Sequence, residues 1–208
     1  MEGRSAQDLA AALARLGIEV EPSLWELAFT HRSYANEEGL SELENNERLE
    51  HLGDAVVDLV VSECLYRRFP GASEGELAKM RAFVVRADSL AKVARRLGLG
   101  ALMKLGKGEE QAGGRARPSL LADLFEAVAG AVFLSRGYDA ARTFVLWALE
   151  ESLAGLSSPK ATADPKTTLQ EHLQARTKCA PTYRLVQDAG PDHAKVFVSE
   201  VVHRGKVL

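Results

Sequence analysis

Residues Leu120–Leu134 read LLADLFEAVAGAVFL and contain only two polar side chains, Asp123 and Glu126, three positions apart. On a helical wheel the apolar residues surround the whole circumference, so the segment is predicted to be a buried helix. Burying two carboxylates costs free energy unless a positive charge neutralises them. A divalent cation is one partner that could do so, and the segment is therefore the first place to look for a reactive site.

A second predicted helix carries a row of acids. It lies in the stretch NNERLEHLGDAVVDLVV, residues 45–61, and its opposite side is rich in Leu and Val. Four carboxylates share one side of the wheel: Glu47, Glu50, Asp54 and Asp58. By itself this pattern also fits an amphipathic helix with a solvated acidic face. Gly53 costs a helix about 1 kcal/mol relative to Ala, which predicts that another backbone or a ligand passes close to it.

Together the two helices predict a metal site. Four carboxylates would form a cluster inside a helical bundle: Glu50, Asp54, Asp123 and Glu126. Oxygen ligands suit Mg²⁺, for which Mn²⁺ could substitute, and such ions support phosphodiester hydrolysis. The set contains no His or Cys, which argues against zinc or iron. Two alternatives stay open: Asp123 and Glu126 could pair with buried arginines, or Asp123 could cap its helix.

The composition is ordinary for a globular protein. The 208 residues are 46% hydrophobic and 26% charged, which is enough for one sizeable core. Cys64 and Cys179 lack the spacing of a disulfide framework or a zinc site, which favours a reducing compartment. No signal-peptide pattern and no apolar run of membrane-spanning length is visible. We therefore expect a cytoplasmic protein without a membrane partner.

Charge divides the chain into two parts. Residues 1–156 carry a net charge of −6 and residues 157–208 carry +3. The change falls at SSPKATADP, residues 157–165, a Ser-, Ala-, Thr- and Pro-rich stretch typical of a linker. We predict an all-α domain over residues 1–156 and a smaller α+β module over residues 166–208. A basic module after an acidic body suits a polyanionic partner.

Helical period and turn residues give the expected elements. In the first part helices are predicted over 5–16, from Pro22, over 46–69, over 73–97, from about 119, and over 139–153. Ser73 and Glu76 form a capping-box pattern, and a Gly-rich loop spans 106–117. In the second part a helix over 167–176 precedes strands over 182–187 and 195–203, and the chain ends where a third strand would begin.

Three segments in this order resemble the bacterial ribonuclease III family. They are LAFTHRSYANE (Leu27–Glu37), NERLEHLGDAVVD (Asn46–Asp58) and LLADLFEAVAGAVF (Leu120–Phe133). The resemblance implies an all-α endonuclease domain, the ribonuclease III type of helical bundle, followed by a double-stranded RNA-binding domain of α+β fold that is truncated here. It also implies a homodimer that uses Mg²⁺ to cut double-stranded RNA into 5′-phosphate and 3′-hydroxyl products. Processing of ribosomal RNA precursors and other structured RNAs would be its role.

The resemblance also implies roles for particular residues. The metal ligands correspond to Glu50, Asp54, Asp123 and Glu126. Asp54 and Glu126 would be catalytic together with Glu47, which lies at the same site, and Glu74 matches an acid near the RNA cleavage valley. At position 51 the family usually has a Phe that inserts into the partner subunit, whereas this chain has His51. A neutral imidazole could replace that aromatic ring directly, or it could make dimer strength depend on pH.

In the C-terminal part the resemblance assigns RNA contacts to four residues: Thr167, Gln170, Glu171 and His193. Modules of this kind read the shape of A-form RNA through 2′-hydroxyls and phosphates. The alternative for the two helix residues Gln170 and Glu171 is an ordinary solvated surface. The family's third strand and final helix are absent from this sequence, so we expect the sheet to lack its covering layer and the module to be marginally stable.

Other features have simpler interpretations. The Gly-rich loop lacks the G-K-[ST] ending of a P-loop, so no nucleotide cofactor is expected. His31 and Ser33 have no partner acid in a recognisable triad and are interpreted as local hydrogen-bonding and packing residues. The basic side chains around the Gly-rich loop, Arg117 among them, include some that could contact the RNA backbone, but most basic side chains of the first part are interpreted as solvated charges. Two competing functions stay open: a catalytically inactive double-stranded RNA-binding protein, and a carboxylate-bundle hydrolase of small phosphorylated molecules.

Overall fold

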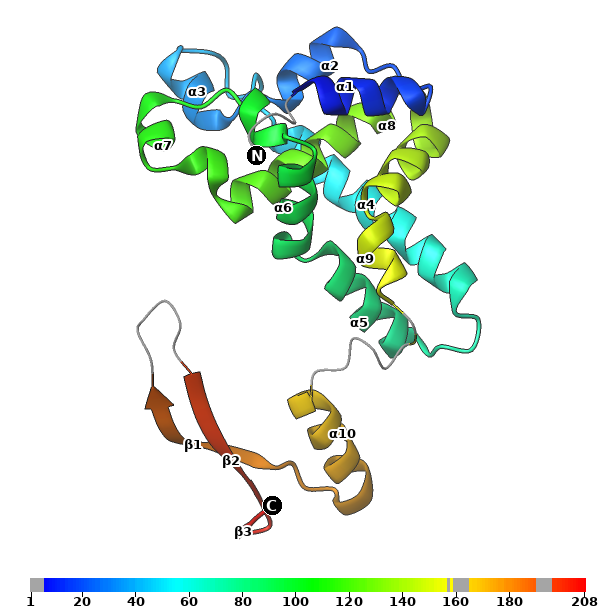
Figure 1. Cartoon of the computed structure of the whole chain (residues 1–208), viewed down its shortest axis with the longest axis vertical. Coiled ribbons are helices and arrows are strands. Elements are labelled where there is room, and N and C mark those ends of the chain that lie inside the picture. The colour runs from blue at the N-terminus through cyan, green and yellow to red at the C-terminus, as the bar shows by residue number, and fades with distance from the viewer. Residues whose placement is uncertain (1–5, 157, 159–164, 190–195) are drawn as a thin grey trace. The chain divides into compact units, whose positions relative to one another are not determined.

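The computed structural model describes residues 6–156, 158, 165–189 and 196–208. The chain separates into two compact units, Met1–Thr162 and Ala163–Leu208. The first unit is helical and the second combines one helix with an antiparallel sheet, as Figure 1 shows. The predicted succession of an all-α part and an α+β part is therefore confirmed.

The helices of the first unit match most of the predicted elements (Figure 1). They are α1 (Ala6–Arg15), α2 (Pro22–Ala28), α3 (Arg32–Glu37), α4 (Glu47–Arg68), α5 (Glu74–Val85), α6 (Ala87–Arg96), α7 (Lys107–Gln111), α8 (Pro118–Ala148) and α9 (Glu150–Ala154). Two short 3₁₀ turns, Leu99–Leu102 and Gly114–Ala116, flank α7.

Helix α8 forms the centre of the hydrophobic core. It packs mainly against α4 and α6. Nearly every apolar residue from Leu121 to Val132 is buried, and Phe125 stacks on Phe144 with ring centroids 5.7 Å apart. The sequence-based prediction of a buried helix is thus confirmed. By length and composition α8 could also cross a membrane, but 56% of its most apolar window is buried inside the unit, as in a core helix.

The crossing of α4 and α8 is closed by two glycines. A Cβ atom added to Gly53 would lie 1.8 Å from the backbone oxygen of Glu126, and one added to Gly130 would lie 2.4 Å from the backbone oxygen of Leu49. Any larger side chain would force the helices apart, because van der Waals contact begins well beyond these distances. The predicted close approach at Gly53 is therefore confirmed, and the neighbour is the backbone of α8.

Several predicted boundaries were wrong. The single helix over 73–97 is two helices, because Arg86 adopts extended backbone angles (φ −58°, ψ 148°) between α5 and α6. The helix expected to begin at 139 continues from α8 through a kink at Gly137, whose φ is +75°. The Gly-rich loop folds into α7 and a 3₁₀ turn. Neither the Arg86 break nor α7 is marked by a proline, the usual local signal.

The capping box at the start of α5 is confirmed. The Oγ of Ser73 accepts from the backbone N–H of Glu76, and the Glu76 carboxylate accepts from the backbone N–H of Ser73 at 2.8 Å. We expect Ser73→Ala to lower the free energy of unfolding by about 1 kcal/mol, the usual contribution of such a cap. Ser73→Asp should restore most of the loss because aspartate also caps well. Urea denaturation measures both variants, and equal midpoints for Ser73→Ala and the native chain would contradict the assignment.

The second unit is a helix followed by a small sheet. Helix α10 (Pro165–Thr177) precedes β1 (Thr182–Ala189), β2 (Val196–His203) and β3 (Lys206–Val207). The strands are antiparallel in the order β1-β2-β3, with an irregularity in register between Leu185 and Gln187. The expectation that the chain ends before a third strand is corrected, because two residues pair as β3. Apolar side chains of the sheet remain exposed, among them Leu185, Val196 and Phe197.

Candidate metal centre

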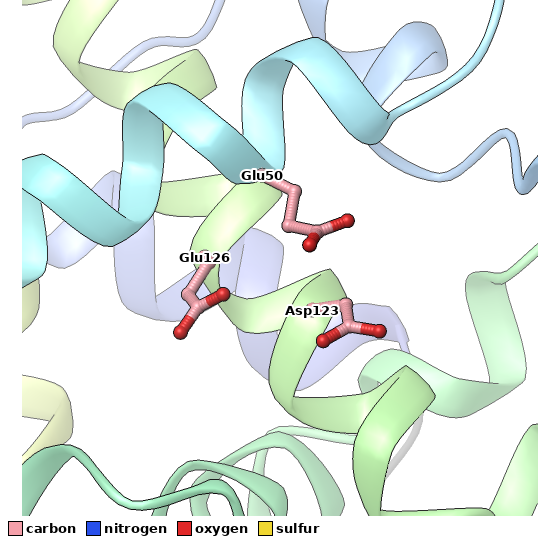
Figure 2. Close-up of side chains that lie close together, drawn as sticks. All are labelled: Glu50, Asp123 and Glu126. Atoms are coloured by element: carbon pink, nitrogen blue, oxygen red, sulfur yellow. The ribbon is translucent and has the colours of Figure 1, made fainter.

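Three carboxylates from two helices meet beside the glycine crossing. Glu50 comes from the first turn of α4, and Asp123 and Glu126 come from successive turns of α8. One oxygen from each lies within 4.8 Å of the others, and all three residues are partly buried. Figure 2 shows the side chains gathered between the two helices. The close contact at Gly53 and Gly130 therefore brings together acids more than 70 positions apart in the sequence.

The electrostatics of the cluster disfavour three negative charges. Burial, and then repulsion from Asp54, Asp123 and Glu50, raises the pKa of Glu126 to about 8. Burial first and Asp123 second raise the pKa of Glu50, and burial raises the pKa of Asp123. Within residues 6–156 no lysine or arginine forms an ion pair with these three side chains. The alternative of pairing with buried arginines is thus contradicted, and the cluster holds uncompensated negative charge.

The donor set fits a hard divalent cation. All donors are carboxylate oxygens, the kind preferred by Mg²⁺ and Mn²⁺. Oxygens around a bound Mg²⁺ lie about 2.9 Å apart when adjacent and about 4.2 Å when opposite, so three oxygens within 4.8 Å of one another could close on such an ion by side-chain movement. A cation would also relieve the repulsion that raises the pKa of Glu126. The residues present therefore match such an ion in chemistry, spacing and charge.

The other predicted acids occupy different positions around the cluster. Asp54 is exposed one turn beyond Glu50 and is not among the three mutually close residues, although its charge helps to raise the pKa of Glu126. Glu47 is exposed and pairs with Arg32 at 3.2 Å. Glu74 lies at the start of α5 in a separate hollow between α4 and α5.

A pocket of about 330 Å³ opens beside Glu50 and Asp123. Its wall contains residues from four parts of the chain: His31, Arg32, Asn46, Glu47, Glu50, Glu109, Arg117, Leu120 and Asp123. The expected local hydrogen bonding of His31 is confirmed by a 2.7 Å contact between its Nδ1 and the Ser33 hydroxyl. The sequence did not predict that His31 and Arg117 lie beside Glu50 and Asp123. The bridge between Thr30 and Lys104 ties the residue before His31 to the segment before α7, and nothing in the local sequence signals it.

Comparisons with known proteins agree on one family. A family model described as ribonuclease-III-like matches residues 21–152. A ribonuclease 3 from Desulforamulus reducens is 47% identical over 195 residues, covering 93% of this chain and 79% of the relative. Another, from Oleidesulfovibrio alaskensis, is 51% identical over 174 residues, covering 84% and 76%.

The chain belongs to the ribonuclease III family.

Solved structures support the same assignment. The nuclease domain of ribonuclease III from Campylobacter jejuni superposes with a TM-score of 0.62 at 40% identity, covering 68% of this chain and 96% of that domain. A second structure of that domain gives a TM-score of 0.61 at 39% identity. The helical unit therefore has the ribonuclease III nuclease fold, and the chain is a phosphodiester hydrolase of the endoribonuclease class.

Position 51, where the family resemblance predicts Phe and this chain has His51, lies in an apolar hollow. His51 is exposed and lines this hollow of about 590 Å³ together with leucines that include Leu43, Leu52 and Leu134. Leu43 and Leu134 are 61% and 52% exposed, which is unusual for two leucines around one hollow.

The structure describes few of the residues predicted to contact RNA in the second unit. Gln170 is exposed on α10. The side chains of Thr167 and Glu171, and all of His193, lie outside the described part of the chain. Their roles stay predictions.

Proposed function

We propose that this ribonuclease III family member hydrolyses double-stranded RNA endonucleolytically with Mg²⁺, leaving 5′-phosphate and 3′-hydroxyl ends. One observation carries the proposal: Glu50, Asp123 and Glu126 converge from two helices, and no lysine or arginine of the described residues forms an ion pair with them. The processing of ribosomal RNA precursors and other structured RNAs in the cytoplasm is the biological role we infer. Mn²⁺ is expected to substitute for Mg²⁺ because it accepts the same oxygen ligands.

Each acid has a stated part in this proposal. Glu50, Asp123 and Glu126 would hold the cation, and Asp54, whose charge already acts on Glu126, would be the fourth ligand. A divalent cation in such a site lowers the pKa of water and neutralises charge that develops on the phosphodiester. Because its pKa is about 8, Glu126 would have to release its proton to hold a cation at neutral pH. Glu47 holds Arg32 at the mouth of the site through their ion pair.

The second unit supports RNA as the substrate. We assign residues 1–156 to the nuclease domain, 157–165 to a linker and 166–208 to a double-stranded RNA-binding module. Its net positive charge favours phosphate contacts, which supply most of the affinity of such modules. Gln170 lies exposed on the first helix of the module, where it could reach a minor groove. Glu74, at the far end of the α4–α5 hollow, is a second candidate for RNA contact.

The decisive experiment is cleavage of an end-labelled RNA duplex. We expect internal cuts with Mg²⁺ or Mn²⁺, none with EDTA, and none on single-stranded RNA. A catalytically inactive RNA-binding protein would bind the duplex without cutting it under any metal condition. A hydrolase of small phosphorylated molecules would neither bind nor cut it above background.

We also propose that the protein is a homodimer through the hollow around His51. The Campylobacter jejuni nuclease domain has a region involved in dimer formation. Here the exposed Leu43 and Leu134 provide an apolar surface that a second copy could cover. A dimer would remove this surface from water, which is the main source of free energy in such interfaces.

The substitution His51→Glu tests the dimer. A carboxylate at the hollow would have to be desolvated on association, so we expect the dimer dissociation constant to rise at least about 100-fold. Sedimentation velocity over a concentration series measures this constant. Gln174→Glu, at an exposed position of α10, introduces the same charge elsewhere and should leave it unchanged. Equal dissociation constants for His51→Glu and the native chain would exclude this interface.

A further inference from the structure

The pocket beside the metal centre combines carboxylates with hydrogen-bond donors. Glu50 and Asp123 lie on one side, while His31 and Arg32 come from the start of α3 and Arg117 precedes α8. The pocket volume of about 330 Å³ is large enough for a phosphate group with its sugar. Glu47 and Glu109 pair with Arg32 and Arg117, but these ion pairs do not use all the N–H donors that line the pocket.

The ring of His31 is oriented by Ser33, which occupies its Nδ1 atom with hydrogen bonds. His31 caps α3: its Nδ1 accepts the backbone N–H of Ser33 at 3.2 Å and lies 2.7 Å from the Ser33 hydroxyl. That hydroxyl also accepts the backbone N–H of Gly106, so its own proton is free to go to Nδ1. Burial lowers the pKa of His31, which favours the neutral form of the ring. The ring proton must then be on Nε2, which has no hydrogen-bond partner among the described residues.

Arg117 is held in the pocket wall by the partly buried Glu109. Its guanidinium lies 2.7 Å from Oε1 of Glu109, an oxygen that is buried and has no well-aligned hydrogen bond. Glu109 therefore depends on Arg117 for charge compensation, which fixes the arginine in place. A guanidinium carries five N–H donors, and a single contact of this kind leaves donors available to a ligand.

We propose that His31 and Arg117 bind the phosphate at which the RNA is cut, which becomes the 5′-phosphate of the product. The proposal rests on the proposed nuclease function and adds two donors to it. Because Glu47, Glu50, Glu109 and Asp123 also line the pocket, a phosphate would be repelled unless the carboxylate cluster holds its cation. A cation held by the carboxylates and the donors of His31 and Arg117 would then bind the same phosphate group. Ser33 acts as a positioning residue by fixing the tautomer of His31.

The test compares two product-like RNA duplexes that differ only in a 5′-phosphate or a 5′-hydroxyl. Binding is measured in Mg²⁺ by fluorescence anisotropy, which does not depend on cleavage. We expect the native protein to bind the phosphorylated duplex at least about tenfold more tightly, the scale of a hydrogen bond to a charged group. His31→Asn keeps an acceptor for the Ser33 N–H, and therefore the helix cap, but removes the Nε2 donor. Arg117→Gln removes the guanidinium.

Both variants should reduce the phosphate preference at least about fivefold while binding the hydroxyl duplex as the native protein does. Arg142→Gln is the matched control, because Arg142 is 41% exposed and pairs with a partly buried glutamate, as Arg117 does. It should retain the full preference. A native protein without the preference, or variants that keep it, would overturn the proposal. Failure of the nuclease function is separate, because it would appear as a native protein that cannot cut a long duplex.

Discussion

The variant Glu126→Gln should lose RNA cleavage and gain stability at the same time. Glutamine keeps the shape of the side chain but cannot become the anionic oxygen ligand that a cation at the metal centre would need. We expect cleavage to fall at least about 100-fold, the scale observed when one electrostatic contact to a transition state is removed. Duplex binding should change little, because Glu126 is partly buried in α8 and phosphate contacts elsewhere dominate affinity.

The gain in stability follows from the sign of the pKa shift. The pKa of Glu126 rises from 4.5 to about 8 on folding, so between these values the folded chain binds a proton that the unfolded chain has released. Stability of the cation-free protein therefore falls as pH rises through this window. Water that reaches this partly buried carboxyl screens part of the repulsion from its neighbours. We therefore expect Glu126→Gln to stabilise the cation-free protein by about 1–2 kcal/mol at pH 8. At pH 4 the two proteins should be equally stable.

Thermal unfolding in EDTA at several pH values measures this difference. Added Mg²⁺ should raise the unfolding temperature of the native protein more than that of the variant, because ligand binding to the folded state is stabilising. Glu150→Gln, at an exposed position of α9, makes the same chemical change away from the cluster. If Glu126→Gln cuts RNA at the native rate, or if both glutamine variants respond alike to Mg²⁺, the metal centre is placed wrongly.

The second large effect is expected from Gly53→Ala. The new methyl group would lie 1.8 Å from the backbone oxygen of Glu126, so α4 and α8 must move apart. Overpacking of this kind costs about 3 kcal/mol, which exceeds the gain of about 1 kcal/mol that alanine brings to an isolated helix. The same movement would separate Glu50 from Asp123 and Glu126, so cation binding should weaken together with stability.

Gly75→Ala is the matched control because it also lies within a helix, α5, and its added methyl group would meet nothing within 4 Å. It should be neutral or slightly stabilising. Urea denaturation gives the stabilities, and titration with Mn²⁺ followed by paramagnetic broadening gives the cation affinity. A Gly53→Ala variant as stable as Gly75→Ala would mean that the helices do not cross as described.

The parts of the molecule predicted from sequence are those with a local cause. Helix α8 is apolar on every side, so its burial needs no knowledge of its neighbours. A glycine at position 53 within a strong helix indicated a close neighbour, and the structure supplies α8. Three of the four predicted metal ligands lie close together. The sequence indicated this because two isolated acids in an apolar helix require partners.

The parts that escaped prediction depend on contacts between distant segments. The break at Arg86, where the backbone is extended between α5 and α6, has no Pro or Gly signal. His31 lies beside the metal centre because Thr30 bridges to Lys104 and Ser33 binds Gly106. Hydrophobic period describes one segment at a time, so it could not bring these residues together.

The paired glycines at the α4–α8 crossing have a consequence for how this enzyme can change over time. Elsewhere in the interior a substitution can be accommodated by neighbours that adopt new rotamers, but here the two main chains touch directly. The distance between the turns that carry Glu50, Asp123 and Glu126 is thus set by direct contact of the two backbones. Single substitutions therefore cannot change it gradually. Variation in this enzyme should accordingly accumulate in its loops and RNA-facing surfaces, while the spacing of its reactive acids stays constant.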